Sequence, residues 1–307
     1  MNAIEIRNLS KSFRGLYAVD HLNMTVPVGA IYGFIGENGS GKSTTEKLIC
    51  GLQVPDGGSI RLFGRDYRDG DAMAKVGVLI ESPGCFPNYS VWNNMMLQAA
   101  NLRIKNPEKE VKEVLRMVRM EGAASNKYKN CSLGMKQRIG IAMALLGHPV
   151  LLVLDEPING LDADGMRIMR EVLVDLAKNK GCTILISSHI LGELEKIATH
   201  YGIIRNGKML KEMTAKELDA QCPTYVALRT ENMDRTQALL RQKYSRVEED
   251  EKGELRVYDA ESPEEVVVYL YKNSILVSEI KTAKIGLEEY YIDLMEEKEG
   301  RSHEKIR

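Results

Sequence analysis

The sequence Gly36-Glu37-Asn38-Gly39-Ser40-Gly41-Lys42-Ser43 stands between the apolar run Ile31–Ile35 and a helical pattern from Thr44 to Cys50. It matches the G-x-x-x-x-G-K-[ST] pattern of a phosphate-binding loop. Glycines in such a loop free the backbone, so that successive N–H groups can point at phosphate oxygens. Because strand, loop and helix occur in the required order, we predict that this segment binds the phosphates of a nucleotide.

The side chains of this loop have separate expected roles. Lys42 supplies positive charge to the phosphates, and Ser43 supplies a hydroxyl ligand for Mg²⁺. The N-terminal dipole of the following helix faces the same anion. The loop alone does not choose among kinases, GTPases and ATPases. The predicted phosphate-binding residues are Gly36, Asn38, Gly39, Gly41, Lys42, Ser43 and Thr44.

Length and composition predict an ordinary globular protein with two domains. The chain has 307 residues, of which 44% are hydrophobic and 28% charged, and its net charge of −1 gives no global attraction to nucleic acid or anionic membrane. The five cysteines are odd in number and lack C-x-x-C spacing, which argues against a disulfide framework or a zinc site and favours a reducing cytoplasm. The sequence also lacks a secretory signal and an apolar stretch of about 20 residues. Any action at a membrane would therefore need another polypeptide.

The first two thirds of the chain alternate short apolar runs with helical patterns, which predicts a mostly parallel sheet covered by helices. The runs 31–35, 151–154 and 183–187 each end at residues suited to chemistry, as expected at the carboxyl ends of parallel strands. Between about 83 and 146 the pattern predicts a helical insert, with one helix capped by Ser90 and another beginning at Pro107. Three further segments predict an antiparallel addition: 4–9, 22–26 and 58–63.

Beyond residue 213 the pattern predicts a second, small α+β domain at 214–297 and a charged, solvated tail at 298–307. Its predicted order is β-α-β-β-α-β, which is typical of a ferredoxin-like fold. A last helix follows at 287–297. The expected strands and helices of the β-α-β-β-α-β unit are strand 225–229, helix 233–244, strand 246–249, strand 255–258, helix 263–271 and strand 275–280.

The apolar segment Leu151-Leu152-Val153-Leu154 leads directly into two carboxylates, Asp155 and Glu156. Asp155 is expected to orient Mg²⁺, through its water shell, because this ion gives up water reluctantly. Glu156 is expected to act as the general base that polarises an attacking water. Following a phosphate-binding loop in one α/β domain, this pair predicts nucleotide hydrolysis.

Two further segments make the chain recognisable: Ser132-Leu133-Gly134-Met135-Lys136-Gln137-Arg138, and His189 at the end of another strand. From about residue 4 to 211 the chain resembles the nucleotide-binding subunit of ATP-binding-cassette (ABC) transporters. In order, the matching motifs are Walker A at 36–44, the signature segment at 131–135, Walker B at 151–156, the D-loop at 159–162 ending in Asp162, and the switch histidine His189.

The resemblance implies an α/β P-loop fold, ATP and Mg²⁺ as cofactors, and ATP hydrolysis that powers transport at the cytoplasmic face of the membrane. In such proteins two cassettes meet head to tail, and the signature segment of one faces the γ-phosphate bound by the other. Ser132 and Gly134 retain what this needs, although Met135 and Lys136 replace the familiar glycine and glutamine. Phe13 falls where the family stacks an aromatic ring on adenine, and His189 would contact the γ-phosphate.

The main departure from the family pattern is Glu81, where transporters generally have glutamine. We expect Glu81 to be a metal-side ligand that couples hydrolysis to movement of a permease. The glutamate, the form of the signature segment and the extra carboxyl-terminal domain are similar to the ATPase subunits of bacitracin and lantibiotic immunity exporters. That resemblance implies export of a peptide antibiotic or a similar amphipathic substrate.

Several alternatives remain open at this point. The mate in the dimer could be a second copy or a homologue, and the partners would be integral-membrane permease subunits, received near Phe86, Tyr89 and Trp92. A cytosolic cassette ATPase acting on ribosomes or DNA is the competing class, but the chain has a single cassette, no room for a long coiled coil and no basic stripe. A phosphoryl-transferring kinase would leave Ser132 and Asp162 unexplained.

Overall fold

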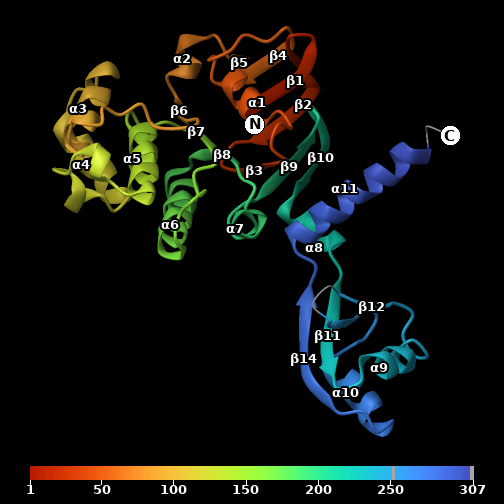
Figure 1. Ribbon diagram of the computed structural model, residues 1–307. Helices are drawn as coiled ribbons and strands as arrows, with labels where there is room; N and C mark the ends of the chain where they lie inside the picture. Colours follow the sequence, from red (N-terminus) through yellow and green to blue (C-terminus); the bar gives the residue numbers. More distant parts are fainter. Residues whose placement is uncertain (251–252, 305–307) are drawn as a thin grey trace. The chain divides into compact units, whose positions relative to one another are not determined.

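The computed structural model describes residues 1–250 and 253–304 of the chain, which divides into two compact units, Met1–Ala215 and a second that begins at Lys216 (Figure 1). The first unit contains the phosphate-binding loop, the carboxylate pair and the histidine that the sequence singles out. The second unit contains the smaller sheet.

A six-stranded sheet forms the centre of the first unit. Its strand order is β10-β9-β3-β8-β7-β6, and neighbouring strands are parallel except β9 and β10. Every residue of β3, β7 and β8 is buried, which explains why these segments read as continuous apolar runs. The predicted mostly parallel sheet is confirmed. Its strands are β3 (Ile31–Ile35), β6 (Val76–Leu79), β7 (Leu151–Asp155), β8 (Thr183–Ser187), β9 (His200–Arg205) and β10 (Lys208–Thr214).

The predicted antiparallel addition is a four-stranded sheet with the order β2-β1-β4-β5. Its first two strands are longer than the sequence suggested, because they join in a two-residue hairpin turn. Both turn residues, Arg14 and Gly15, have positive φ values, 51° and 83°, as a tight type I′ turn requires. The strands are β1 (Asn2–Phe13), β2 (Leu16–Pro27), β4 (Gly57–Leu62) and β5 (Arg65–Asp66).

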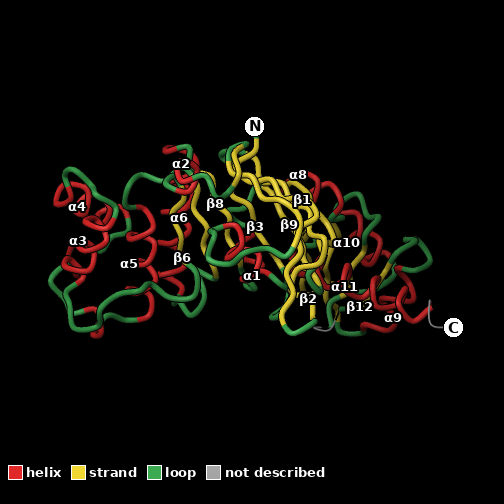
Figure 2. The backbone as a smooth tube through the Cα atoms, turned by 90° about the horizontal axis from the view of Figure 1, so that it is seen from above, coloured by secondary structure: helices red, strands yellow, loops and turns green. Residues whose placement is uncertain are grey.

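Helices surround the six-stranded sheet, and three of them form the predicted helical insert. In Figure 1 and Figure 2, α3, α4 and α5 group together beyond the β6 side of the sheet. The Ser90 hydroxyl caps α3 by accepting a hydrogen bond from the N–H of Asn93, and α4 begins at Pro107, both as expected. The helices of this unit are α1 (Lys42–Ile49), α2 (Gly70–Met73), α3 (Val91–Asn101), α4 (Pro107–Met117), α5 (Leu133–Leu145), α6 (Ala163–Lys180) and α7 (Leu191–Glu195), with 3₁₀ turns η1 (Glu121–Ala123) and η2 (Tyr128–Asn130).

The main hydrophobic core joins the two sheets of this unit through α1. Ile4, Ile6 and Met24 of the antiparallel sheet share one buried cluster with Leu48 of α1 and Val153 of β7. The phosphate-binding loop and its helix are therefore fixed between the two sheets rather than displayed on a free loop.

The second unit has the predicted β-α-β-β-α-β order, and its antiparallel sheet has the strand order β12-β13-β11-β14. This order is that of a ferredoxin-like fold. The predicted helix 233–244 ends earlier, at Leu240, and the last strand is displaced to Val277–Lys284. The elements are α8 (Ala215–Gln221), β11 (Thr224–Thr230), α9 (Met233–Leu240), β12 (Val247–Glu249), β13 (Leu255–Val257), α10 (Pro263–Lys272), β14 (Val277–Lys284) and α11 (Leu287–Glu304).

Helix α11 continues to Glu304, into the segment that the sequence suggested would be a solvated tail. The side-chain exposure from residue 297 onward, and residues 305–307 altogether, lie outside the described residues, so solvation of the tail stays a prediction. All five cysteines are free thiols. None of the helices within the described residues combines the length and apolar character needed to cross a bilayer.

Close packing of α5 on β6 depends on Gly77. A Cβ atom added there would lie 2.0 Å from the carbonyl oxygen of Ala144 and 2.7 Å from the side chain of Leu152. We expect Gly77→Ala to lower the free energy of unfolding by about 1–3 kcal/mol, because the backbone of α5 must shift. Urea denaturation of the purified protein measures this change.

Gly122→Ala is the matched control, since a Cβ atom at Gly122 meets no atom within 4 Å. Its free energy of unfolding should stay within about 0.5 kcal/mol of the parent protein. Equal stability of the two variants would show that α5 does not press on β6 at this point.

Candidate nucleotide-binding site

The residues that the sequence singles out follow four strands that are consecutive neighbours in the six-stranded sheet, β3, β8, β7 and β6. The phosphate-binding loop follows β3, and His189 follows β8. Asp155 ends β7 and Glu156 comes next, while Glu81 lies just past β6. Since these strands are parallel, their carboxyl ends meet at one edge of the sheet.

A cavity of 360 Å³ lies at this edge. It brings together Lys42, Ser43, Asp155 and Glu156, which come from α1 and the end of β7. Ala18 of β2 contributes the wall from the antiparallel sheet. Among the described residues, the lining consists of Ala18, Asn38, Gly39, Gly41, Lys42, Ser43, Thr44, Asp155 and Glu156.

The side chain of Lys42 is hydrogen-bonded to the backbone at the start of its own phosphate-binding loop. Lys42 is 6% exposed, and its amino group donates hydrogen bonds to the carbonyl oxygens of Gly36, at 2.6 Å, and Glu37, at 3.1 Å. Gly41 has a φ of 109°, and a Cβ atom there would lie 2.3 Å from the carbonyl oxygen of Ala18. Only glycine fits this position, which explains the residue type in the motif.

Ser187, the last residue of β8, organises the carboxylates of β7. Its hydroxyl donates a hydrogen bond to Asp155 at 2.8 Å and accepts one from the N–H of Glu156 at 3.1 Å. Asp155 is 8% exposed and Ser187 is fully buried. The parallel register of β7 and β8 places Asp155 directly beside Ser187, so the sheet itself fixes the orientation of the Asp155 carboxylate.

Glu156 and His189 form a second pair at the same edge. Nδ1 of His189 lies 2.7 Å from Oε2 of Glu156, and the side chains are 50% and 23% exposed. Glu156 has a φ of 48°, in the left-handed region that non-glycine residues rarely adopt. Such local strain is common where a side chain must be aimed at a reactive site.

Glu81 is attached to the helix that follows the phosphate-binding loop. Lys47 of α1 donates a hydrogen bond of 2.6 Å to its carboxylate, and this contact holds the pKa of Glu81 below its ordinary value. Glu81 does not line the 360 Å³ cavity. The sequence argument did not foresee its ion pair with Lys47.

The remaining predicted residues lie outside the cavity. Phe13 stands at the tip of the β1–β2 hairpin and is 45% exposed, with the amino group of Lys11 5.5 Å from its ring centre. Ser132 caps the N-terminus of α5, with Gly134 in the first turn, and Asp162 caps α6. The 360 Å³ cavity is therefore lined by residues of the Walker A and Walker B segments. The signature segment and the D-loop lie elsewhere on this unit.

Comparison with known proteins agrees with this arrangement. Residues 19–159 match the family model described as ABC transporter. The bacitracin transport ATP-binding protein BcrA of Bacillus licheniformis is 36% identical over 297 residues, which cover 95% of this chain and 97% of that protein. The chain belongs to the family of ABC transporter ATP-binding proteins. ATP is accordingly the nucleotide, and the activity is ATP hydrolysis.

One further similarity in sequence supports this assignment, and one in structure supports the fold. The lantibiotic transport ATP-binding protein SrtF of Streptococcus pyogenes is 40% identical over 216 residues, which cover 70% of this ABC ATPase and 91% of SrtF. A solved ATP-binding cassette, in a dimeric post-hydrolysis state with ADP and Pi bound, has a TM-score of 0.64 at 22% identity and covers 69% of this chain and 98% of that one. The latter similarity supports the fold alone.

The donor atoms of this ABC ATPase suit Mg²⁺ bound together with a nucleotide. A hydroxyl from Ser43 and a carboxylate from Asp155 line the same cavity, and both supply the oxygen ligands that Mg²⁺ prefers. Within the described residues, no group of three or more His, Cys, Asp or Glu side chains could hold a metal ion by itself. One or two protein oxygens together with phosphate oxygens are a usual Mg²⁺ environment.

Sequence reasoning missed one carboxyl group at this site, Glu46. It is fully buried on α1, where burial raises its pKa well above the ordinary value and the nearby Asp155 carboxylate raises it further. Ser187 and Lys42 act in the opposite direction but are weaker. Its position one turn after Lys42 was visible in the sequence, but its contact with Asp155 arises only when α1 packs on β7.

The raised pKa makes stability depend on pH. Above the ordinary value of 4.5, Glu46 ionises in the unfolded chain but keeps its proton in the folded one, so the folded state is progressively less favoured as pH rises. Glu46→Gln keeps the shape and removes this effect. We expect the variant to unfold at a higher temperature than the parent protein at pH 8, with a smaller difference at pH 5.5, in nucleotide-free thermal unfolding.

Glu108→Gln, which changes an exposed glutamate of α4, is the control and should show no such trend. A difference between Glu46→Gln and the parent that stays constant from pH 5.5 to 8 would mean that Glu46 is ionised in both states.

Proposed function

We propose that this ABC ATPase powers the export of a peptide antibiotic, or a similar amphipathic compound, from the cell membrane. The observation that carries the substrate class is the similarity to BcrA, which extends over 95% of the chain and therefore through both units. The similarity to SrtF, a lantibiotic transport protein, points to the same class. In this proposal the chain works at the cytoplasmic face, bound to integral-membrane permease subunits.

The cavity supports the following division of roles in ATP binding. The ammonium group of Lys42 and the loop N–H groups bind the phosphates, and the N-terminus of α1 adds its dipole. Ser43 and Asp155 would hold Mg²⁺, with the Asp155 carboxylate oriented by Ser187. The ion, when bound, neutralises charge on the phosphate oxygens. Phe13, exposed at its hairpin tip, would stack on adenine.

The pair at the end of β7 and β8 supports the hydrolysis step. Glu156 accepts the proton of the attacking water, and His189 contacts the γ-phosphate. A neutral His189 ring that donates from Nδ1 to Glu156 has a lone pair at Nε2. Donation from Nε2 to a phosphate oxygen therefore requires either a protonated ring or an opened Glu156–His189 contact.

The position of the signature segment supports completion of the site by a second cassette. Ser132 and Leu133 are exposed at the N-terminus of the 13-residue helix α5, a terminus suited to an anion. Neither residue lines the cavity of its own chain. In this proposal ATP lies between Lys42 of one cassette and Ser132 of the other, with Asp162 near the same interface.

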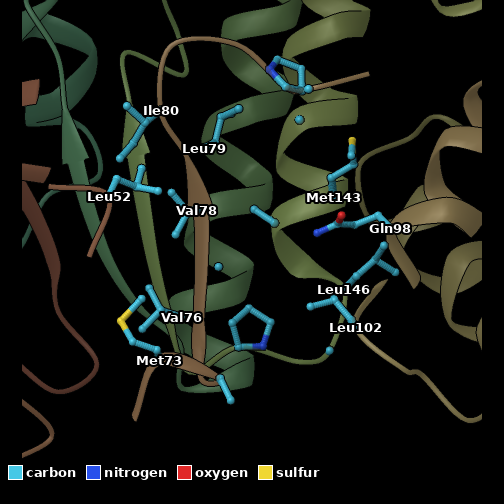
Figure 3. A pocket seen from close by; sticks show the side chains of 18 of the residues that line it. Leu52, Met73, Val76, Val78, Leu79, Ile80, Gln98, Leu102, Met143 and Leu146 are labelled. Atoms are coloured by element: carbon cyan, nitrogen blue, oxygen red, sulfur yellow. The ribbon is translucent and has the colours of Figure 1, made fainter. Parts of the chain in front are cut away.

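A groove beside Glu81 supports the permease contact. The groove has a volume of 570 Å³ and lies between β6 and the helical insert; Figure 3 shows Val78 and Leu79 of β6 together with Gln98 of α3 and Met143 of α5. Phe86, Tyr89 and Trp92, which the sequence suggested for this role, do not line it. Phe86 and Tyr89 instead form an exposed aromatic pair, with ring centres 5.3 Å apart, on the segment that leads from the groove to α3.

The first test concerns the composite site. Glu156→Gln removes the general base but keeps the size of the side chain, so we expect ATP turnover to fall by about 10²–10⁴-fold while ATP binding persists. Trapped ATP should hold two cassettes together. Phosphate release and size-exclusion chromatography with light scattering, with and without Mg²⁺-ATP, measure the two effects.

The parent protein and Glu195→Gln, which changes an acid outside the cavity, are the controls and should turn over ATP normally. A Glu156→Gln protein that binds ATP yet remains monomeric would contradict a shared site.

In the native cell, the Glu156→Gln variant should fail to protect against the exported peptide antibiotic. Unchanged resistance to bacitracin and lantibiotics would contradict the proposed substrate class.

The second test concerns the permease. Phe86→Asp combined with Tyr89→Asp places two charges on the exposed aromatic pair, and we expect loss of the membrane partner without loss of ATP binding. Affinity purification from detergent-solubilised membranes, followed by mass spectrometry, measures recovery of a polytopic protein.

Tyr17→Asp is the matched control, because Tyr17 is 59% exposed but lies on the β1–β2 hairpin. It should keep the partner. Recovery of the same polytopic protein with the double variant would exclude the aromatic pair from the contact.

A further inference from the structure

The ion pair between Lys47 and Glu81 joins the nucleotide-binding helix to the loop that leads to the helical insert. The Nζ atom of Lys47 lies 2.6 Å from Oε1 of Glu81, and the two side chains are 28% and 69% exposed. Lys47 belongs to α1, whereas Glu81 follows β6. The contact therefore links two segments that belong to different parts of the same site.

The position of Lys47 on α1 determines where Glu81 is held. Lys47 follows Ser43 by four residues, so the two side chains lie on the same face of the helix, one turn apart. One helical turn advances about 5.4 Å along the axis. Lys47 thus retains the Glu81 carboxylate on the face of α1 that carries the hydroxyl proposed for Mg²⁺.

The backbone of the loop gives Glu81 a defined position as well. Glu81 has a φ of 66°, a left-handed conformation that non-glycine residues adopt uncommonly. Further along the loop, Asn94 of α3 is 2% exposed and binds both the N–H and the carbonyl oxygen of Phe86, at 2.7 and 3.2 Å. The loop is therefore tied to α1 at one end and to α3 at the other.

We propose that Lys47 is a positioning residue that competes with Mg²⁺ for the carboxylate of Glu81. Glu81 is paired with Lys47 in the structure, and in this proposal its release from Lys47 accompanies binding of Mg²⁺ with the nucleotide. The inference rests on the proposed binding of Mg²⁺-ATP at this site. Lys47 also balances the charge of the Glu81 carboxylate.

A double-mutant cycle tests the competition. The proteins are the parent, Lys47→Met, Glu81→Gln and the double variant, since methionine keeps most of the lysine stem. The first measurement is binding of a non-hydrolysable fluorescent ATP analogue in EDTA, followed by titration with Mg²⁺. We expect Lys47→Met to lower the half-saturating Mg²⁺ concentration by about threefold when Glu81 is present and to have no effect beside Gln at position 81, as suits a largely exposed ion pair.

The second measurement needs neither metal nor nucleotide. Trp92 of α3 is the single tryptophan of the chain, so its emission and its quenching by acrylamide report on the helix to which the Glu81 loop is tied. We expect Lys47→Met to change this signal in the parent background and to leave it unchanged in the Glu81→Gln background, where the pair is already broken.

Two controls separate the competition from a structural role. Lys47→Arg keeps a cation and should retain the parent values. Lys281→Met breaks an ion pair of 3.0 Å with Glu254 in the second unit and should leave Mg²⁺ dependence unchanged.

Equal shifts in the Glu81 and Gln backgrounds, or no shift in either, would overturn the competition while leaving the proposed ATPase intact. Failure of the parent protein to bind the analogue in EDTA and in Mg²⁺ would overturn the proposed nucleotide site, and this inference with it.

Discussion

Parallel pairing of β3, β8, β7 and β6 is the constraint on which the site depends. These strands are far apart in the sequence but consecutive in the sheet, so their carboxyl ends bring the phosphate-binding loop, His189, the Asp155–Glu156 pair and Glu81 to one edge. Backbone hydrogen bonds in the sheet fix the register of the strands, and this register also fixes the positions of the residues at the strand ends. Catalytic groups on separate flexible loops would each need their own supports.

Two carboxyl groups, Glu46 and Asp155, are buried close together at this edge of the sheet. Asp155 is nearly buried, and Glu46 is fully buried behind it on α1. Two carboxylates in such a place repel each other and lose water, so the more buried one holds its proton while Ser187 donates a hydrogen bond to Asp155. With Glu46 protonated and Asp155 bonded to Ser187, α1 and β7 can pack closely.

The sequence predicted what is local and left out what depends on packing. Apolar runs and glycine spacing were enough for β3, β7 and β8, because a strand buried on both faces must be apolar throughout. The β-α-β-β-α-β order was readable from the periods of its elements. The early end of α9 at Leu240, the extension of α11 to Glu304 and the full length of the β1–β2 hairpin were not, because neighbouring segments decide them.

At the site, too, local motifs were predicted from the sequence, whereas contacts made by packing were not. The sequence singled out Lys42, Asp155, Glu156 and His189 as candidates from their motifs, and the structure brings Lys42, Asp155 and Glu156 into one cavity. Glu46 was missed because a glutamate in a helix is ordinarily exposed, and its partner stands more than a hundred positions away. The Lys47 contact to Glu81 was missed because nothing in the local pattern pairs α1 with the loop after β6.

The Lys47–Glu81 pair places a cation beside a carboxylate at the edge of the sheet that carries the phosphate-binding loop. Because both side chains reach solvent, the ion pair adds little to folding stability, and its consequence is instead where the carboxylate sits. Lys47 lies on the same helix face as Ser43, so the Glu81 carboxylate is held on that face of α1.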